Sequence, residues 1–318
     1  MKVAFYTPHM CLRGTTVALF DYAKYNEEIL GNESWIVTDE QHDFHDDSVF
    51  EKFEQKFPSR IVRVKNEQTI DPAIIENSID AIYIIKPGRR DKRMASACKT
   101  LIHVIGPTHP SEKHGSVWAY ASKWLNNYCS GGTHPMVPYM IEPPKDTTSN
   151  LRSELGIPQD ATVFGRTGGK ETFDIPWVNN AILAALNADS NLYFVFQNTD
   201  LSIAHERIKV VKSTADFDFK EKFINTCDAM LHARSYGESF GVACGEFGVR
   251  GKPVFTFARS RERNHIDVLG TKGFLYNNQE ELYSKMIAFD RNDGKDYYTY
   301  LEYSPENVMQ IFKQVFLD

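Results

Sequence analysis

Two glutamates eight residues apart have the side-chain type and spacing best suited to bind a polyhydroxylated ligand. Glu238 and Glu246 lie in the segment 232–254, HARSYGESFGVACGEFGVRGKPV, in which a helix is expected to begin between Ser239 and Gly241. At 100° per residue, eight residues bring the second glutamate close to the face of the first. A carboxylate accepts hydrogen bonds well from two adjacent hydroxyl groups, and burying it without partners is costly. The segment therefore predicts a diol site, with a capping acid and a solvated helix residue as the alternative.

The expected helix start in the same segment has the properties of an anion site. Its first backbone N–H groups, at Ser239, Phe240 and Gly241, lack partners within the helix, and the helix dipole adds partial positive charge. A diphosphate has the charge and the acceptor oxygens that such a site prefers.

A second turn carries an arginine and a lysine after an expected strand. The segment 163–174 reads VFGRTGGKETFD and contains Arg166 and Lys170. Two cations facing one pyrophosphate would offset the charge that develops on it as a leaving group, without a metal ion. A P-loop is excluded, because that motif requires Gly-x4-Gly-Lys followed by serine or threonine, and Glu171 follows the lysine here. A solvated loop is the remaining alternative.

A third turn, residues 6–16 (YTPHMCLRGTT), follows the first expected strand. Gly14 permits a close backbone approach to a ligand, and Thr15 or Thr16 could either cap the next helix or contact a phosphate or an acceptor. Both roles stay open. On the same grounds Arg13 could be a cation of the site. The segment 42–47, HDFHDD, has metal-ligand residue types but no regular element to frame them. We interpret it as a solvated acidic loop and expect no metal site.

The elements that must position these turns alternate between strands and helices along the whole chain, which is typical of parallel sheets covered on both faces. Strands are expected at Val3–Tyr6, Ser34–Thr38, Ile61–Val64, Ala81–Ile85, Leu101–Ile105, Trp118–Ala121, Val163–Phe164, Leu192–Phe196, Ile208–Val211, Ala229–Ala233, Pro253–Phe257 and Gly273–Leu275. Helices are expected at Thr16–Leu30, Val49–Lys56, Lys92–Lys99, Lys123–Tyr128, Val178–Asn187, Phe219–Thr226, Val242–Arg250, Gln279–Phe289 and Pro305–Phe316.

Length and one break in this pattern predict two domains. A chain of 318 residues exceeds what a single core normally holds. The alternation stops between Pro135 and Asn150, a proline-rich stretch typical of a linker. We therefore expect two Rossmann-like, doubly wound α/β domains at residues 1–140 and 141–300, followed by a helical segment at residues 301–318 with an apolar stripe.

Composition excludes several classes of protein. The 36 basic and 42 acidic residues give a net charge of −6, the opposite sign to that usual in nucleic-acid binders. The five cysteines show no paired spacing, which favours reduced thiols in a cytoplasmic protein. Because no run of 18 apolar residues occurs, no transmembrane segment is expected.

Together the motifs resemble those of retaining glycosyltransferases of the GT-B fold, in particular glycosyltransferase family 4. The pattern Glu-Ser-Phe-Gly-x4-Glu with a following Gly-Lys-Pro-Val is similar to the E-x7-E signature of that family. Arg166 and Lys170 resemble its Gly-Arg…Lys element, and the segment 151–158, LRSELGIP, resembles its usual lead-in. The sequence departs from the family pattern at residues 247–250, FGVR.

This resemblance implies two Rossmann-like domains facing each other across a cleft, with the acceptor bound by residues 1–140 and the nucleotide sugar by residues 141–300. Residues 301–318 would pack back on the first domain. In these roles Glu238 contacts the sugar, Glu246 holds the ribose, and Arg166 and Lys170 stabilise the leaving diphosphate. The remaining implied positions are Gly14 and Thr15 opposite the phosphates, Ser213 and Thr214 along the base, and His109 near the donor sugar, with His103 and His114 as alternatives to His109.

The predicted function is transfer of a hexose-type sugar from a UDP- or GDP-sugar to a hydroxyl of a glycan or other acceptor, with retention and without a metal or other cofactor. The expected partners are that donor and acceptor, with no nucleic acid, and the oligomeric state is left open. Two further functions stay possible on the sequence. One is a GT-B epimerase or phosphorylase with different acids, and the other is a subunit that binds a nucleotide without catalysis.

Overall fold

The computed structural model describes residues 1–212 and 216–318, which form two compact units. Unit 1 comprises Met1–Met140 together with Tyr303–Asp318, and unit 2 comprises Ile141–Glu302. The chain thus leaves unit 1 after Met140 and returns to it at Tyr303.

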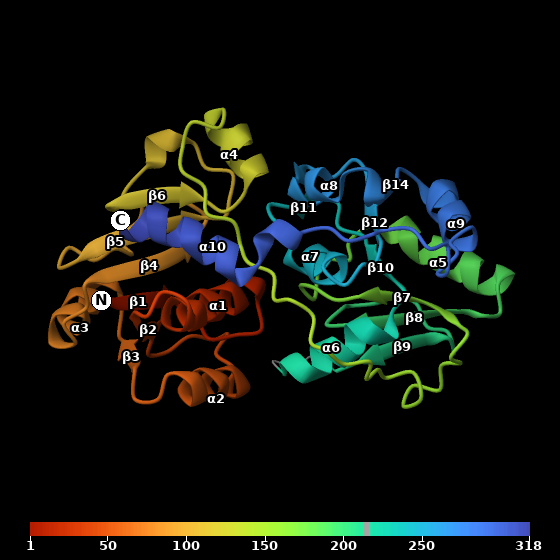
Figure 1. Cartoon of the computed structure of the whole chain (residues 1–318), viewed down its shortest axis with the longest axis horizontal. Coiled ribbons are helices and arrows are strands. Elements are labelled where there is room, and N and C mark those ends of the chain that lie inside the picture. The colour runs from red at the N-terminus through yellow and green to blue at the C-terminus, as the bar shows by residue number, and fades with distance from the viewer. Residues whose placement is uncertain (213–215) are drawn as a thin grey trace. The chain divides into compact units, whose positions relative to one another are not determined.

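Unit 1 is built on a six-stranded parallel sheet in the order β3-β2-β1-β4-β5-β6 (Figure 1). Its strands are β1 (Lys2–Thr7), β2 (Glu33–Asp39), β3 (Ile61–Val64), β4 (Ala81–Lys86), β5 (Lys99–Val104) and β6 (Val117–Tyr120). Its helices are α1 (Gly14–Glu28), α2 (Asp47–Lys56), α3 (Ile70–Glu76), α4 (Lys123–Ser130) and α10 (Pro305–Phe312). This strand order is that of a Rossmann fold, so the α/β prediction is confirmed.

Successive side chains along a strand point to opposite faces of the sheet, so the core of unit 1 has two parts, one on each face. On one face, Tyr6 and Ile82 pack with Ile74 of α3. On the other face, Phe5 and Tyr83 contact Phe312 of α10, with ring centroids 6.5 and 5.3 Å away. Helix α10, drawn in blue in Figure 1, lies beside α1 on this second face. The apolar stripe of the C-terminal helix therefore belongs to the unit 1 core.

One predicted helix of unit 1 is wrong and another was missed. Residues 92–98 form no helix, because the Asp71 carboxylate accepts hydrogen bonds from the backbone N–H groups of Ser96 and Ala97, holding an irregular turn. The helix lies instead at α3, whose short sequence IDPAIIE carries Pro72 in its first turn. In a sequence, a proline at this position suggests that no helix is present, although the first turn of a helix tolerates proline.

Unit 2 repeats the same architecture, with the sheet order β14-β12-β10-β7-β8-β9 and all pairs parallel. Its strands are β7 (Thr162–Arg166), β8 (Leu192–Gln197), β9 (Ile208–Val211), β10 (Ala229–His232), β12 (Val254–Phe257) and β14 (Phe274–Tyr276), and a separate pair joins β11 (Gly237–Glu238) to β13 (Glu262–Arg263). Its helices are α5 (Pro176–Ala188), α6 (Phe217–Thr226), α7 (Val242–Gly248), α8 (Asn264–Leu269) and α9 (Gln279–Ile287).

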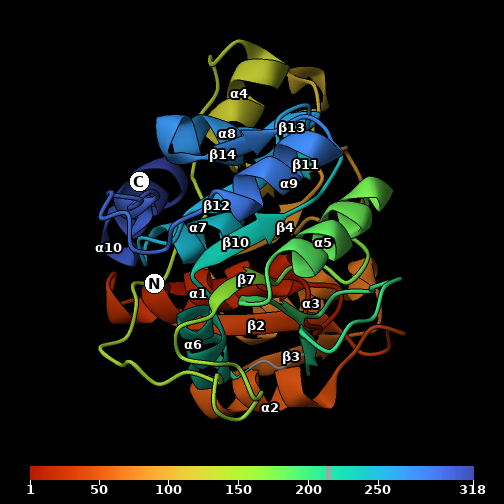
Figure 2. The same cartoon turned by 90° about the vertical axis from the view of Figure 1, so that its right-hand side faces the viewer.

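Helices cover both faces of the unit 2 sheet. Figure 2 shows α5 and α9 side by side on one face, where Val178 and Leu282 pack with Phe164 in a single core cluster. On the opposite face Phe223 of α6 meets Phe247 of α7, with ring centroids 6.4 Å apart. Strands β7 and β10 are therefore buried between two layers of helices, and this packing fixes the positions of the turns that follow them.

Candidate functional site

Two of the predicted site residues of unit 2, Arg166 and Glu238, lie close to the point where the strand order of its sheet reverses. Ligands of open α/β sheets bind at the carboxyl ends of the strands beside such a switch point. Here the switch lies between β7 and β10. Arg166 ends β7, His232 ends β10, and Glu238 follows six residues after His232 in the short strand β11.

Two glycines shape the turn that presents Glu238. Gly237 has φ +79°, and a Cβ added to it would collide with the backbone carbonyl of Glu262 in the paired strand β13. Gly241 has φ +94° and forms the N-cap of α7, where a Cβ would lie 2.8 Å from that of His265. Because L-residues rarely adopt these backbone angles, glycine is required at both positions.

Glu238 is held as a carboxylate with both oxygens engaged. Oε1 accepts a hydrogen bond from His232 Nε2 at 3.2 Å, and Oε2 accepts one from Arg234 Nη1 at 3.0 Å. Burial by itself would raise the pKa of Glu238, but the hydrogen bond and the electrostatic attraction of His232, followed by the charge of Arg234, outweigh it and lower the pKa to about 2. A quarter of the side chain remains exposed. Glu238 can therefore meet a ligand as a fixed, charged acceptor.

Behind Glu238 lies a buried chain of hydrogen bonds from His232 through Thr256 to His265. His232 Nδ1 is 2.8 Å from Thr256 Oγ1, which is 3.0 Å from His265 Nε2. Burial lowers the pKa of His265 to about 3, so its ring is neutral. Its Nδ1 has no hydrogen-bond partner in the described part of the chain.

The ionised Glu238 can only accept, so His232 donates to it from Nε2. On the other side of His232, the Thr256 hydroxyl lies between His232 Nδ1 and His265 Nε2 and can donate to one ring while accepting from the other. The sequence did not reveal this hydrogen-bond chain, because Thr256 and His265 both lie beyond the segment 232–254 that contains the motif.

A second acid, Glu262, lies beside this turn and was not anticipated either. It pairs with Gly237 across β11 and β13 and is buried. Burial, reinforced by the charge of Glu238 and opposed by that of Arg234, raises the pKa of Glu262 to about 7. Two carboxyl groups on one pair of short strands thus have pKa values shifted in opposite directions.

Glu246 is the fifth residue of α7 and lies about one turn from the helix start, because α7 begins at Val242, just after the expected range of Ser239 to Gly241. Its Oε1 accepts a hydrogen bond from Lys220 Nζ of α6 at 2.6 Å. Arg250, paired with the buried Glu221, donates to the Glu246 backbone carbonyl at 2.7 Å. Glu246 is thus an anchored carboxylate, with lone pairs remaining for other donors.

Arg166 and Lys170 occupy different environments. Arg166 is 2% exposed and donates to the Gly169 carbonyl and to the hydroxyls of Thr172 and Thr199, so its guanidinium holds the turn after β7. Burial lowers the pKa of Arg166 to about 10, which leaves it charged at neutral pH. Lys170 has 68% of its side chain exposed and lies 3.5 Å from Asp200. The structure therefore presents one buried and one exposed cation at this turn.

The predicted amide donors have mixed exposure. Phe240 is buried, and its carbonyl accepts hydrogen bonds from Asn264 and Tyr300. Ser239 is half-buried. Ser213 and Thr214, predicted to line a base, lie outside the described residues.

The predicted site residues of unit 1 lie on the carboxyl side of its sheet, except for one core histidine. Gly14 and Thr15 begin α1, whose N-cap is Arg13 and has no side-chain cap, so capping by Thr15 is not seen. His103 is fully buried between Tyr83 and the Val137 carbonyl, and burial lowers its pKa to about 3. His103 is therefore a core residue.

The other two histidines follow β5. His109 is exposed and accepts a hydrogen bond from the Ser111 backbone. His114 is nearly buried, donates to the Glu112 carbonyl and leaves Nε2 without a partner among the described residues. Of the two, His109 is the one accessible to solvent.

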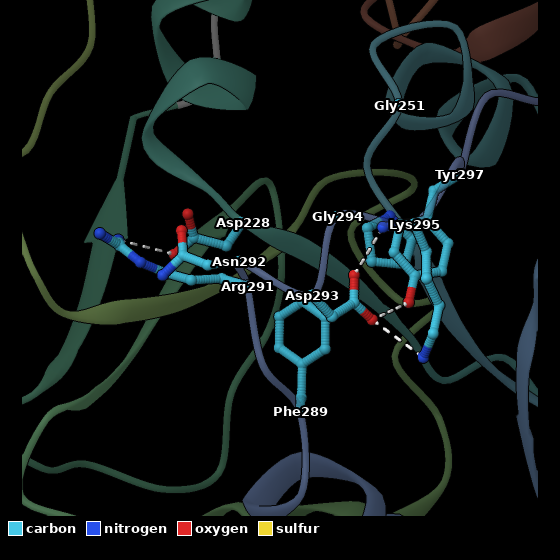
Figure 3. Close-up of a pocket in the computed structure, with 10 residues that line it drawn as sticks. Asp228, Gly251, Phe289, Arg291, Asn292, Asp293, Gly294, Lys295 and Tyr297 are labelled. Atoms are coloured by element: carbon cyan, nitrogen blue, oxygen red, sulfur yellow. Dashed lines mark hydrogen bonds and ion pairs between the residues drawn. The ribbon is translucent and has the colours of Figure 1, made fainter.

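Two pockets of unit 2 lie at opposite ends of its strands, one at the carboxyl ends and one at the amino ends. One of about 560 Å³ is lined by Asp174 and Asp200, in the turns after β7 and β8. The other, of about 300 Å³ and drawn in Figure 3, includes Asp228 and Pro253, which precede β10 and β12. There Asp293 points toward Tyr297 and Lys295, at 2.7 and 3.1 Å. The second pocket is at the amino ends of the strands and is separate from Glu238.

Metal-binding clusters and membrane-spanning helices are both absent from residues 1–212 and 216–318. No set of three or more His, Cys, Asp or Glu residues in these ranges is arranged to hold a metal ion. Within the same ranges, no helix is both long and apolar enough to cross a lipid bilayer.

Comparisons with known proteins give the fold. Neither a protein-family model nor a curated protein sequence matches the chain. The crystal structure of Anabaena HepE in complex with UDP-glucose is similar over 99% of this chain and 95% of that one, with a TM-score of 0.69 and 15% identity. Sucrose-phosphate synthase from Thermosynechococcus elongatus covers the same shares at TM-score 0.61 and 11% identity. A putative UDP-N-acetylglucosamine 2-epimerase from Listeria monocytogenes is also similar over 99% of this chain and 95% of that one, with a TM-score of 0.62 and 13% identity. The chain accordingly has the two-domain α/β fold of GT-B proteins.

Proposed function

We propose that the chain is a retaining glycosyltransferase that moves a hexose-type sugar from a UDP- or GDP-sugar to an acceptor hydroxyl. The observation that carries this proposal is Glu238, a fixed carboxylate at the switch point of unit 2, within a sequence pattern similar to E-x7-E. The similarity in fold to HepE, whose crystal structure contains UDP-glucose, supports a nucleotide-sugar donor.

In the proposed mechanism Glu238 accepts hydrogen bonds from sugar hydroxyls and keeps its charge at all working pH values. Glu246 accepts from the ribose hydroxyls while Lys220 holds it in place. Arg166 supplies fixed positive charge beneath the turn after β7, and Lys170 can leave Asp200 to meet the diphosphate because both side chains are largely exposed. These cations offset the charge of the leaving diphosphate without a metal ion.

Retention is pictured as attack by the acceptor on the same face from which the diphosphate departs. The acceptor hydroxyl forms the new glycosidic bond as the sugar–phosphate bond breaks, and its proton passes to a phosphate oxygen of the leaving group. No protein nucleophile is required, so Glu238 binds and orients the sugar without bonding to it.

An epimerase is the second candidate function, and the similarity in fold to the putative epimerase from Listeria supports it. The two functions differ in their products. A transferase makes a glycoside and a free nucleoside diphosphate. An epimerase converts one nucleotide sugar into another or, with water, into the epimeric free sugar and a nucleoside diphosphate.

A donor screen tests the proposal. UDP-, GDP-, ADP- and dTDP-sugars are each added to the full chain, and thermal unfolding and product formation are recorded. A donor present at 100 times its dissociation constant stabilises the fold by about 2.7 kcal/mol. When an acceptor saccharide is also present, a glycoside formed with retention of anomeric configuration, together with release of nucleoside diphosphate, supports the transferase. Conversion between nucleotide sugars supports the epimerase, and a melting temperature unmoved by every nucleotide would contradict both.

A further inference from the structure

The carboxyl edge of the unit 1 sheet carries a cluster of side chains that the proposed donor site does not use. The order β3-β2-β1-β4-β5-β6 reverses between β1 and β4, so the turns after these strands flank a switch point like that of unit 2. We call the side chains there the edge cluster. It consists of His9 and Arg13 after β1, His42 and Phe44 after β2, and Arg93 after β4.

An exposed aromatic ring lies at the centre of the edge cluster. Phe44 is 50% exposed although three neighbours hold it. The Arg13 guanidinium carbon is 4.4 Å from its ring centroid, and the rings of His42 and His9 lie at 5.3 and 6.2 Å. Arg13 and the two histidine rings thus surround an aromatic ring that keeps half of its surface open to a ligand. A sugar ring has an apolar face of the size that stacks on a phenyl ring.

Two guanidinium groups give the edge cluster its charge. Burial is the main cause that lowers the pKa of His9, and the nearby positive charges of Arg13 and Arg93 lower it further. The two arginines belong to different turns: Arg13 lies over the Phe44 ring, and Arg93 lies in the turn after β4, where its backbone carbonyl accepts from Lys86 Nζ at 3.5 Å. Neither arginine forms an ion pair with any described residue.

The nearby acids are largely occupied. Asp91, in the same turn as Arg93, binds the nearly buried Lys86 at 2.6 Å and the Arg93 backbone N–H at 2.9 Å. Asp39 accepts from the Tyr6 hydroxyl at 2.7 Å, and Asp46 caps α2. Asp43 is exposed beside Phe44. Two arginine side chains therefore remain available to an anion in a protein of net charge −6.

We propose that the edge cluster binds an anionic acceptor: a saccharide that carries a phosphate or a carboxylate. Phe44 stacks on its apolar face, while Arg13 and Arg93 hold the anionic group through the forked, charge-assisted hydrogen bonds that guanidinium forms with both groups. This inference rests on the proposed transferase and adds the class of its acceptor.

The test compares neutral and charged acceptors in matched pairs. Glucose is set against glucose 6-phosphate and glucuronate, with the donor found by the screen, and kcat/KM is measured for each. The charged members are expected to exceed glucose at least about tenfold, a ratio that 0.5 M NaCl reduces. Arg93→Gln is expected to bring the ratio close to one, and Arg93→Lys to restore part of it. Phe44→Leu lowers kcat/KM for all three acceptors. Lys123→Gln, which removes an exposed charge from α4, is the control and leaves the ratio unchanged.

Saturation-transfer NMR with the same saccharides and no donor separates this inference from the proposed function. Binding of glucose 6-phosphate or glucuronate that Arg93→Gln abolishes supports the edge cluster even if no donor is turned over. Equal use of glucose and its charged analogues overturns the inference while leaving the transferase intact. An Arg93→Gln variant that loses affinity for UDP as strongly as for the acceptor also overturns it, because the cluster would then bind the donor phosphates.

Discussion

His232 and Glu238 are joined by a single hydrogen bond from Nε2 to Oε1, 3.2 Å long, and this bond connects Glu238 to the buried chain behind it. An ionised carboxylate cannot donate, so His232 carries a proton on Nε2, while its Nδ1 faces the Thr256 hydroxyl. The position of a partly exposed carboxylate is thereby tied to a histidine on α8 that no ligand need touch.

Replacing Glu238 by glutamine tests its charge without changing its size. The amide cannot match the carboxylate toward both Arg234 and the sugar, and loss of such an electrostatic group lowers kcat/KM by about 100-fold or more. Steady-state kinetics and thermal unfolding measure the two effects. Glu206→Gln, an exposed glutamate in the same unit, is the control. Turnover at the wild-type rate in Glu238→Gln would remove this residue from the site.

Thr256→Val removes the hydroxyl that links the two histidines while keeping the shape of the side chain. His232 Nδ1 and His265 Nε2 each lose a partner in a buried region, which destabilises the fold by about 1–3 kcal/mol. Because His232 is then less firmly oriented, kcat is expected to fall more than KM rises. Thr256→Ser retains the hydroxyl and should recover both the stability and kcat. Equal behaviour of the two variants would show that the chain does not position Glu238.

Gly237→Ala separates steric collision from backbone strain. At φ +79° the alanine is strained, and its Cβ also meets the Glu262 carbonyl. Gly156→Ala is the matched variant, with φ +65° and open space around it, and is expected to lose about 1–2 kcal/mol from strain alone. Chemical denaturation should show a clearly larger loss for Gly237→Ala. Losses of the same size would mean that β11 and β13 separate easily.

The pH dependence of stability provides a signature of Glu262. Its pKa of about 7 in the folded state exceeds the ordinary 4.5, so between these values the folded state binds more protons than the unfolded state. Its contribution therefore destabilises the fold progressively as the pH rises through this window. Glu262→Gln removes the effect, and its free energy of unfolding relative to wild type should be more favourable at pH 8 than at pH 5. Glu280→Gln, an exposed change on α9, should show no such difference.

Chelation tests the proposed absence of a metal. If Arg166 and Lys170 offset the diphosphate charge, transfer should proceed at an unchanged rate after dialysis against EDTA. Strict dependence on a divalent ion, restored by Mg²⁺ or Mn²⁺, would contradict the proposed role of these two cations.

Local periodicity was sufficient to predict most of the fold. Continuous apolar runs such as Val3–Tyr6 and Leu192–Phe196 indicate strands that are buried on both faces of a sheet. Such a run can be recognised from a few neighbouring residues alone. The helix expected at Lys92–Lys99 failed because Asp71, more than twenty residues away, supplies the hydrogen bonds that hold the turn. Hydrogen bonds from a residue so distant in the sequence cannot be predicted from the residues of the turn itself.

For the candidate site, the sequence located the turns but not the pairing of their side chains. Glu238 can be singled out from its motif, yet His265 lies beyond the next strand and shares no spacing with it. Arg166 and Lys170, four residues apart, are expected from the sequence to act as a pair. One ends a buried strand and the other follows two glycines, so their burial and partners differ.

The return of the chain to unit 1 at Tyr303 has a consequence for biosynthesis. A ribosome releases the residues of unit 2 before it makes α10, the helix that covers Phe5 and Tyr83. Unit 2 can therefore finish folding during translation, whereas the sheet of unit 1 has an uncovered aromatic surface until the final helix emerges. Nascent chains stalled before residue 303 should accordingly recruit chaperones through their earliest-made strands.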